Sequence, residues 1–266
     1  MNPVLTTVGL TGRYSLRAAH AFFSVCMLIT DTINWVVLQP MRGKGLRVRS
    51  TIIHFVEFGA HSLPIVSLIC FLTGAIMAMQ ASYQLARFGA TVYIANLVGV
   101  AAMREFAPLM TAIILTGRSG SAITAEIGTM KVAEEIDALE VMGVNPTKFL
   151  VVPKFLGMLF AVPCLSILAT FIMILGGYVV GTTLVDIDPK TYIDQTIQSL
   201  QSKDFYTGLT KSIFFALTIC WVGVYRGFQV EGGAEGVGKQ TTSSVVTSIF
   251  LIVIVDLVFT ILFFFA

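Results

Sequence analysis

The stretch FLGMLFAVPCLSILATFIMILGGYVVGTTLV, residues 155–185, contains no charged side chain. A helix needs about 20 apolar residues to cross the roughly 30 Å of hydrocarbon in a bilayer, so this run is long enough to span a membrane by itself. A second uncharged run, residues 62–86, also reaches that length. The two runs predict a membrane protein built from helices.

The composition supports the same prediction. Of the 266 residues, 56% are hydrophobic and 12% are charged, which is about half the charged fraction of a typical soluble domain. Charged residues mark the ends of five predicted spans, near 62–86, 98–118, 155–183, 206–227 and 243–265. We therefore expect an all-α integral membrane protein with two parts, an N-terminal cytoplasmic or interfacial segment (1–61) and a membrane domain (62–266).

Basic residues predict the orientation of these spans. With five spans, residues 1–61, 118–154 and 226–239 share one side and carry twelve lysines and arginines, against four on the opposite side. The positive-inside rule then places the N-terminus in the cytoplasm and the C-terminus outside. Residues 18–39 are apolar but include His20, Asp31 and Asn34. We interpret them as a helix in the membrane interface, the alternative being a sixth span.

Several classes of protein find little support in the sequence. The formal net charge of +2 and the lack of a basic block argue against nucleic-acid binding. The four cysteines and three histidines are isolated from one another, so we expect no metal site and no metal-dependent or serine hydrolase. Gly233–Lys239 has the spacing of a phosphate-binding loop, but Gln240 replaces the Ser or Thr that would hold magnesium. We expect no nucleotide or other cofactor on this chain.

Four charged residues fall inside the predicted spans and become candidate functional residues. Such groups are costly in hydrocarbon and usually face a protein interior or a wet cavity. Arg104 and Glu105 are neighbours that point about 100° apart on a helix, so each needs its own partner. Lys211 is the expected partner of Glu105, and Arg104 suits a phosphate or carboxylate. Asp256 is either a proton site or part of an interhelical hydrogen bond.

Two further patterns concern the first span and helix packing. Met77, Gln80, Tyr83, Gln84 and Leu85 recur at helical spacing and mix flexible apolar surface with hydrogen-bonding groups, as either a lipid-sized cavity or ordinary helix packing requires. The small-residue pairs Gly74 with Ala78 and Gly177 with Gly181 favour close helix approach within the bundle, with dimerisation as the alternative.

The polar segment GRSGSAITAEIGTMKVAEEIDALEVMGVNP, residues 117–146, lies between the second and third spans on the predicted cytoplasmic side. Its pattern predicts a short acidic amphipathic helix, capped by Thr129 and stopped at Gly143. The helix is either a solvated connector or a docking element for a soluble partner.

With this segment, the chain resembles the MlaE-type permeases, the membrane subunits of ABC transporters that act with MCE proteins. The resemblance covers nearly the whole chain, including Arg104–Pro108, Pro153–Phe155, the approach to Lys211 and the sequence GVGKQTTSSVV. It implies that 62–266 is an MlaE-like permease domain. It also implies a bacterial inner-membrane location with a periplasmic C-terminus.

The resemblance further implies a function, partners and site residues. It implies a non-catalytic homodimer that transports phospholipid between the inner membrane and a periplasmic MCE protein, for outer-membrane lipid homeostasis. ATP and Mg²⁺ would bind a separate cytoplasmic ABC ATPase, with a small cytoplasmic regulatory subunit. The implied lipid pocket comprises Met77, Gln80, Gln84, Leu85, Phe88, Arg104, Glu105 and Lys211, where Phe88 replaces a tyrosine found in a relative. The implied ATPase-coupling residues are Lys131, Glu134, Glu135, Asp137, Leu139 and Met142.

Two alternative functions remain open at this point. One is an ion-coupled secondary transporter centred on Asp256. The other is a membrane-embedded lipid enzyme that uses Glu105 or a histidine. Neither alternative accounts for the polar segment 117–146.

Overall fold

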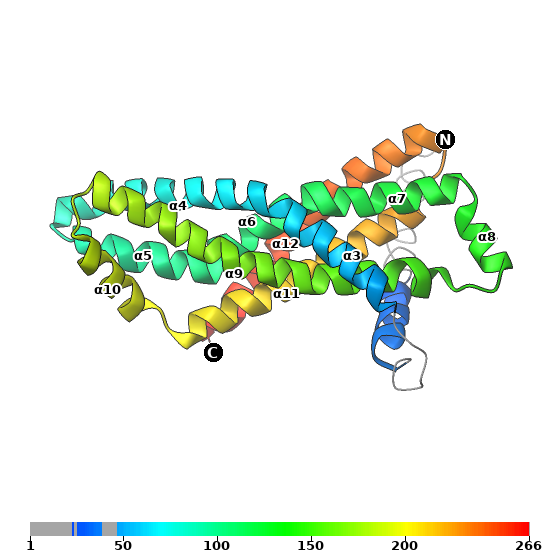
Figure 1. Cartoon of the computed structure of the whole chain (residues 1–266), viewed down its shortest axis with the longest axis horizontal. Helices are drawn as coiled ribbons and strands as arrows, with labels where there is room; N and C mark the ends of the chain where they lie inside the picture. The colour runs from blue at the N-terminus through cyan, green and yellow to red at the C-terminus, as the bar shows by residue number, and fades with distance from the viewer. Residues whose placement is uncertain (1–22, 24–25, 39–46, 266) are drawn as a thin grey trace, which may run out of the picture.

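The computed structural model describes residue 23 and residues 26–38 and 47–265, and it contains no β-strand within them. The helices form an elongated bundle, with α4, α5 and α10 toward one end, α7 and α8 at the other, and α9 running along its length between them (Figure 1). Their bounds are α3 Val48–Gly59, α4 Leu63–Leu85, α5 Ile94–Ala101, α6 Ala107–Leu115, α7 Ser121–Val132, α8 Glu135–Val141, α9 Val152–Thr183, α10 Pro189–Ser199, α11 Ser202–Phe228 and α12 Gly233–Phe265.

Within the described residues, five helical stretches are long and apolar enough to cross a membrane. They are Val48–Phe88, Thr91–Val132, Thr147–Thr183, Ser202–Phe228 and Gly233–Phe265. Each contains one predicted span, so the all-α, five-span prediction is confirmed. The first has 41 residues, which at about 1.5 Å per residue is roughly twice the hydrocarbon thickness. The bundle therefore extends well beyond the hydrocarbon layer.

Two of these stretches continue through a widened, π-helical turn just before a proline. In Ala102–Phe106 (η5), the Ala107 amide donates to the Ala102 carbonyl, and Pro108 follows. In Thr147–Val151 (η7), the Val152 amide donates to the Thr147 carbonyl, and Pro153 follows. Proline has no N–H to continue the α-helical pattern, so the wider turn keeps the helix continuous. One such turn carries Arg104 and Glu105.

Glycines allow the helices to approach closely. A Cβ at Gly74 would overlap the Met173 backbone, so α4 and α9 are in backbone contact there. A Cβ at Gly177 would lie 2.7 Å from a Val98 methyl, and one at Gly181 would lie 2.6 Å from the Tyr192 ring. Both predicted small-residue pairs therefore include glycines that pack within the chain.

Helix α10 covers the end of the bundle away from α8. It begins after Asp188, whose carboxylate accepts a hydrogen bond from the Thr191 amide at 3.0 Å. Tyr192 is 1% exposed and meets the Tyr178 ring edge-on at 5.5 Å between centroids. Its hydroxyl has no hydrogen-bond partner, and burial raises the pKa of Tyr192 to about 12.

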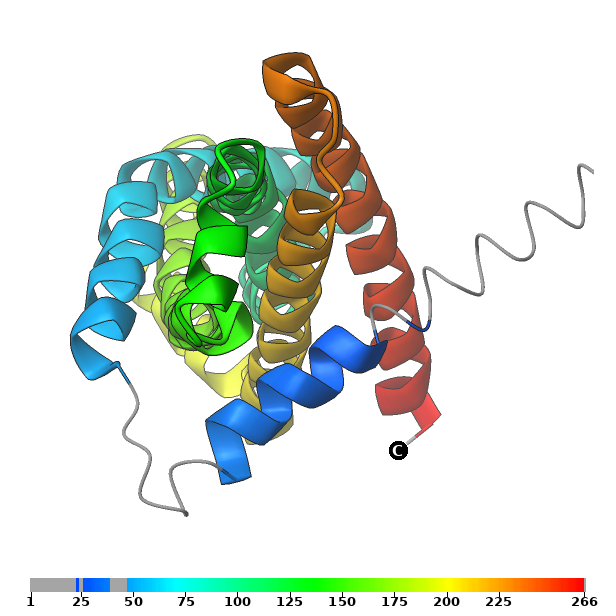
Figure 2. The same cartoon turned by 90° about the vertical axis from the view of Figure 1, so that its right-hand side faces the viewer.

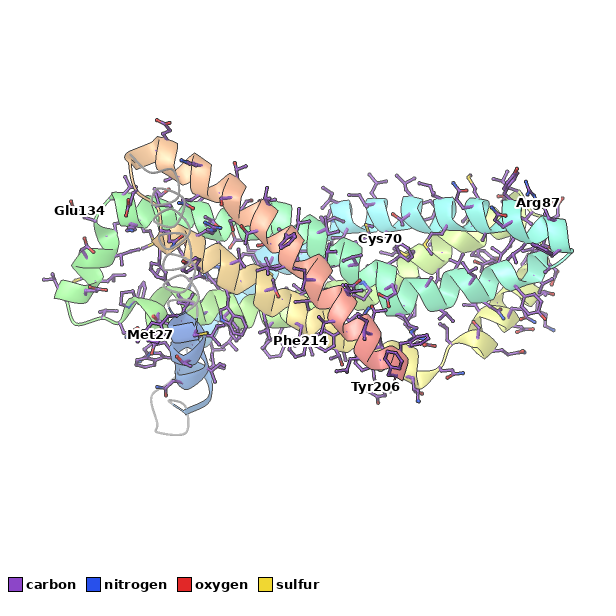
Figure 3. The ribbon with its side chains drawn as sticks, turned by 180° about the vertical axis from the view of Figure 1, so that it is seen from behind. Met27, Cys70, Arg87, Glu134, Tyr206 and Phe214 are labelled. Atoms are coloured by element: carbon purple, nitrogen blue, oxygen red, sulfur yellow. The ribbon has the colours of Figure 1, made fainter. Side chains whose placement is uncertain are left out.

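The predicted interfacial helix, 18–39, lies partly outside the described residues. Residues 26–38 are helical and run across the long axis of the bundle near the end that carries α8 (Figures 1 and 3). Thr32 is fully buried, and Leu28 and Val36 pack against the main core. This direction supports an interfacial helix, which stays a prediction. The division at residue 61 also stays a prediction, although α3 continues into α4 through a single 3-10 turn (Ala60–Ser62, η2).

We predict that Gly74→Ala lowers the thermal stability of the purified protein by about 1–3 kcal/mol, because the added methyl must separate α4 from α9. Gly238→Ala is the matched control, since a Cβ there meets nothing within 4 Å. Thermal melts in detergent measure both. Equal melting temperatures for the two variants would contradict the close approach of α4 and α9.

A second prediction concerns high pH. An exposed tyrosine ionises near pH 10, whereas Tyr192 stays neutral in the folded protein until about pH 12. The contribution of neutral Tyr192 to the stability of the folded protein is therefore fully present below pH 10. As the pH rises from about 10 toward 12, the free energy of unfolding falls by about 1.4 kcal/mol per pH unit, because the unfolded chain releases the phenol proton while the folded chain keeps it. Tyr192→Phe should lose less stability over this range in melts across pH, whereas Tyr206→Phe, at an exposed site, should behave like the parent.

Candidate functional site

Three of the four charged residues predicted inside the spans, Glu105, Lys211 and Asp256, meet in a cluster around Lys211. The Lys211 ammonium donates hydrogen bonds to Glu105, to Asp256 Oδ1 at 2.9 Å and to Thr260 Oγ1 at 2.7 Å. Glu105 lies in the second span, Lys211 in α11, and Asp256 and Thr260 in α12. The predicted pairing of Glu105 with Lys211 is confirmed. Asp256 is paired as well, as the hydrogen-bonding interpretation of that residue expected.

The lysine of this cluster is shielded from solvent, whereas its two carboxylates are partly exposed. The Lys211 side chain is 0% exposed, whereas the Glu105 side chain is 30% exposed and that of Asp256 is 19% exposed. Two carboxylates facing one ammonium give the cluster an excess of acceptor oxygens. The cluster therefore holds three spans together while keeping carboxylate oxygens within reach of a ligand or water.

Arg104 has a different partner, as the sequence predicted. Its Nε lies 3.6 Å from Asp204 Oδ1. The other oxygen of Asp204 accepts from the Gln201 amide at 3.0 Å, so this carboxylate also caps α11. The Arg104 side chain remains 38% exposed. It keeps donors available beyond this ion pair.

Arg104 lines a cavity of about 510 Å³. Its walls come from η5, from the start of α11 and from the end of α12, and they include Lys203, Tyr206, Phe263 and Phe264. This volume lies within the 300–1,000 Å³ typical of small-molecule sites. Basic, hydroxyl and aromatic groups on one cavity suit an amphiphile with an anionic head.

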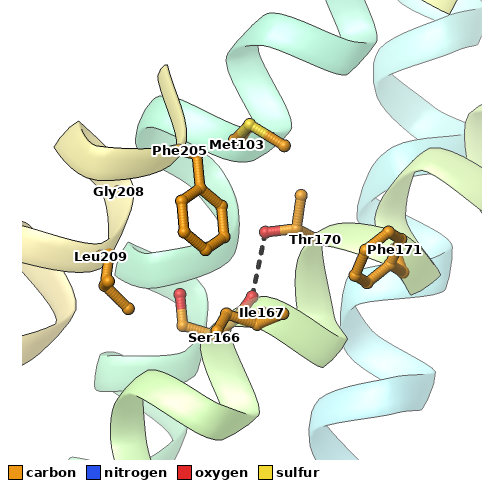
Figure 4. A pocket seen from close by; sticks show the side chains of 8 residues that line it. All are labelled: Met103, Ser166, Ile167, Thr170, Phe171, Phe205, Gly208 and Leu209. Carbon is orange, nitrogen blue, oxygen red and sulfur yellow. Dashed lines mark hydrogen bonds between the residues drawn. The ribbon is translucent and has the colours of Figure 1, made fainter. Parts of the chain in front are cut away.

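A second cavity, beside the cluster, is much smaller. It lies between η5, α9 and α11, and Figure 4 shows Phe205 and Leu209 facing Ser166 and Thr170 across it. Its volume is about 30 Å³, enough for about one water molecule. A ligand larger than water can therefore be held near Arg104 only by the larger of these two cavities, the one that Arg104 lines.

The predicted pocket residues of the first span lie on the part of α4 farthest from α8. Met77 and Leu85 pack against a smaller hydrophobic cluster, whereas Gln80, Gln84 and Phe88 are exposed. They stand outside the cavity that Arg104 lines. The predicted lipid pocket that combines these residues with Arg104, Glu105 and Lys211 stays a prediction.

Helix α8 occupies the opposite end of the molecule, where Figure 3 labels Glu134 far from Arg87. Ile136 is buried and Leu139 packs against the core, which fixes one face of α8. The exposed residues of α8 and its two flanking positions are acidic or apolar: Glu134, Glu135, Asp137, Ala138, Glu140, Val141 and Met142. The helix ends at Val141, and Gly143, with φ +73°, follows in the turn where the sequence predicted the stop.

The start of this helix differs from the prediction. Thr129 lies inside α7, where its hydroxyl donates to the Ala125 carbonyl at 2.8 Å, so it does not cap α8. The break comes later, at Glu134, which has φ +58°. Lys131 Nζ donates to the Phe228 carbonyl at 2.6 Å and ties α7 to the end of α11.

A second group of charged residues, which was not predicted from the sequence, lies near the α8 end. Lys154 is 1% exposed, and its Nζ lies 2.6 Å from Glu126 Oε1 and 3.5 Å from His54 Nε2. Arg118 Nη1 donates to Ser62 Oγ at 2.6 Å. A lysine directly after Pro153 and before a long apolar run was the available signal, because a charge at that position needs a partner.

The segment Gly233–Lys239 forms the first turns of α12. A phosphate-binding loop needs a strand before it and a helix after it. Here the preceding element is α11, and the described residues contain no strand. The spacing of these glycines therefore lacks the structural context of such a loop.

Comparison with known proteins places the chain in a family. A family model described as Permease MlaE matches residues 51–262. A probable ABC transporter permease protein of Rickettsia prowazekii is 34% identical over 98% of this chain and 99% of its own length, and one of Rickettsia conorii is 39% identical over 95% and 96%. The intermembrane phospholipid transport system permease protein MlaE of Haemophilus influenzae is 33% identical over 76% and 78%. The chain therefore belongs to the MlaE permease family.

Proposed function

We propose that this permease, as a homodimer, forms the membrane path of an ATP-driven phospholipid transporter. ATP and Mg²⁺ would bind a separate cytoplasmic ABC ATPase, and a periplasmic MCE protein would exchange lipid with the permease. A small cytoplasmic regulatory subunit completes the proposed complex. The name of the Haemophilus influenzae relative, a phospholipid transport permease, supports the substrate.

One geometric observation carries the proposed mechanism. Glu105 lies in the helical stretch Thr91–Val132, which ends three residues before α8 begins at Glu135. A displacement of α8 by a docked ATPase would therefore pass along α7 and α6 to η5, where Glu105 meets Lys211. The residues proposed to couple the ATPase to this displacement are Lys131, Glu134, Glu135, Asp137, Leu139 and Met142.

The proposed lipid site joins the two groups of pocket residues across the dimer. Arg104, Glu105 and Lys211 provide charge, and the exposed side of α4 provides Met77, Gln80, Gln84, Leu85 and Phe88. The Arg104 guanidinium suits a lipid phosphate because it presents several donors in one plane. A change in the Lys211 cluster would then alter the packing of the helices around the lipid.

The proposed orientation has the N-terminus and α8 in the cytoplasm and the C-terminus in the periplasm. The excess of lysine and arginine on one side supports it. In this orientation α10 and the Arg104 cavity lie toward the periplasm, on the side of the proposed MCE partner.

The alternative of an ion-coupled transporter loses its original support. That alternative started from Asp256 as a lone carboxylate within the membrane, whereas Asp256 accepts a hydrogen bond from Lys211. Glu105, the candidate residue of a lipid enzyme, is likewise paired with Lys211.

We predict that Asp137→Lys lowers ATP-dependent lipid transfer by about tenfold in proteoliposomes containing the full complex. The acidic surface of α8 suits a basic docking surface on the ATPase, which a lysine at position 137 would repel. Glu231→Lys is the matched control, an exposed acid on another connection at the same end of the molecule. Transfer at the parental rate in Asp137→Lys would count against coupling through α8.

A second prediction separates structure from transport at Lys211. Lys211→Met leaves two unpaired carboxylates near the core and should destabilise the protein by about 3–5 kcal/mol. The triple variant Lys211→Met, Glu105→Gln, Asp256→Asn removes all three charges, so it should recover most of the stability in thermal melts.

Lipid transfer by the triple variant is the decisive measurement. If the charges serve the movement of lipid, transfer should stay low although the fold is restored. Recovery of transfer together with stability would assign the cluster to helix association alone.

A further inference from the structure

A third cavity lies between α11 and α12, in the half of the bundle that carries α8. Its volume is about 220 Å³, and its lining includes Trp221, Tyr225, Arg226 and Thr247. It shares no lining residue with the Arg104 cavity. Arg226 lies in the last turn of α11, and Thr247 faces it from α12. The proposed transport function does not use this cavity.

Arg226 lacks the carboxylate partner that three other partly or fully buried cations in the described residues have. Arg104 pairs with Asp204, Lys154 with Glu126, and Lys211 with two carboxylates. Within the described part of the chain, Arg226 takes part in no ion pair. The Arg226 Nη2 donates a hydrogen bond to Thr247 Oγ1, at 3.1 Å. The cavity therefore carries the positive charge of the Arg226 guanidinium, whose hydrogen-bond partner is the neutral hydroxyl of Thr247.

Two donors at this cavity are buried and have no hydrogen-bond partner. They are Arg226 Nε and Trp221 Nε1. A buried donor without an acceptor costs about 1–3 kcal/mol, so two of them on one cavity indicate a missing acceptor. The Trp221 ring is held by stacking on Phe155, at 5.6 Å between centroids, which fixes the position of its N–H.

The surroundings identify the chemistry of that acceptor. Arginine with tryptophan and tyrosine at the end of a membrane span is typical of the headgroup level of a bilayer. Basic pockets between spans on the cytoplasmic side bind anionic lipid headgroups. Helix α12 also exposes Val246 and Phe250 along its length, which gives acyl chains an apolar surface.

We propose that the cavity between α11 and α12 binds the phosphate of an anionic phospholipid from the leaflet on the α8 side. The phosphate oxygens accept hydrogen bonds from the Arg226 guanidinium and, after a small adjustment of the side chains, from Trp221 Nε1. Thr247 holds the guanidinium toward α12. The site is separate from the proposed transport pocket, so its failure would leave the proposed function intact.

The sequence offers a direct reporter, because Trp221 is one of only two tryptophans. Trp35→Phe removes the other and keeps an aromatic ring beneath Lys148 Nζ, which lies 5.0 Å from the Trp35 ring. The full chain with this change is placed in nanodiscs that contain brominated phosphatidylglycerol or brominated phosphatidylcholine, and quenching of Trp221 fluorescence gives the relative affinity of the two lipids.

We expect an affinity for phosphatidylglycerol about five times that for phosphatidylcholine, since one basic residue at the membrane surface contributes about 1 kcal/mol. Arg226→Gln should reduce this ratio to near one, whereas Arg226→Lys should keep most of it. Lys239→Gln is the matched control. It removes an exposed positive charge near the start of α12, outside the cavity, and should leave the ratio unchanged.

Three results would overturn the proposal. Equal quenching by the two lipids in the Trp35→Phe protein would do so, and this comparison needs no change at Arg226, so it holds even if Arg226→Gln fails to fold. Preference for phosphatidylglycerol that persists in Arg226→Gln would do so as well. The third is a change in Trp221 fluorescence on adding inorganic phosphate to phosphatidylcholine nanodiscs, if it depends on Arg226, because the site would then bind a soluble anion.

Discussion

Neutralising the Lys211 ammonium is the constraint on which the arrangement of the membrane domain depends. An ion removed from water costs several kcal/mol unless partners replace the hydration. Lys211 has no solvent exposure, and its partners come from η5 and α12. Sliding any of these helices by one turn, about 5.4 Å, would separate the ammonium from an acceptor. One side chain therefore fixes the register of three spans.

The same constraint connects the two ends of the molecule. Glu105 lies on the π-helical turn that Pro108 follows, within a helical stretch that continues to Val132 beside α8. A π-helical turn carries an extra residue per turn, and such turns are frequent at functional sites. The helix can thus remain continuous while the Glu105 side chain is directed at α11. Coupling α8 to the Lys211 cluster requires a helix that stays continuous between them and a polar contact from that helix to the cluster. The stretch Thr91–Val132 has both properties.

Structure was predicted well from the sequence inside the membrane spans, where charged residues are few. It was predicted less well at the helix ends, where charged residues are common. The five spans followed from the positions of charges, and Glu105 was paired with Lys211 because few ionisable groups lie inside the spans. Asp204 was missed because a charged residue at a helix start needs no partner within the membrane. The cap at Thr129 was wrong because helix α7 passes through it, and the left-handed backbone of Glu134, a residue with a Cβ, leaves no clear signal in the sequence.

Helix α12 shows how polar contacts replace the hydrophobic effect inside a bilayer. Lipid chains are as apolar as the helix surface, so apolar contact alone gives little reason for α12 to join the bundle. Its inward residues recur every fourth position: Ser244, Ser248, Ile252, Asp256 and Thr260. Ser244 meets Thr124 of α7 at 2.9 Å near one end, and Asp256 and Thr260 meet Lys211 near the other. The polar contacts at the two ends of this stripe therefore position α12 against α7 and α11.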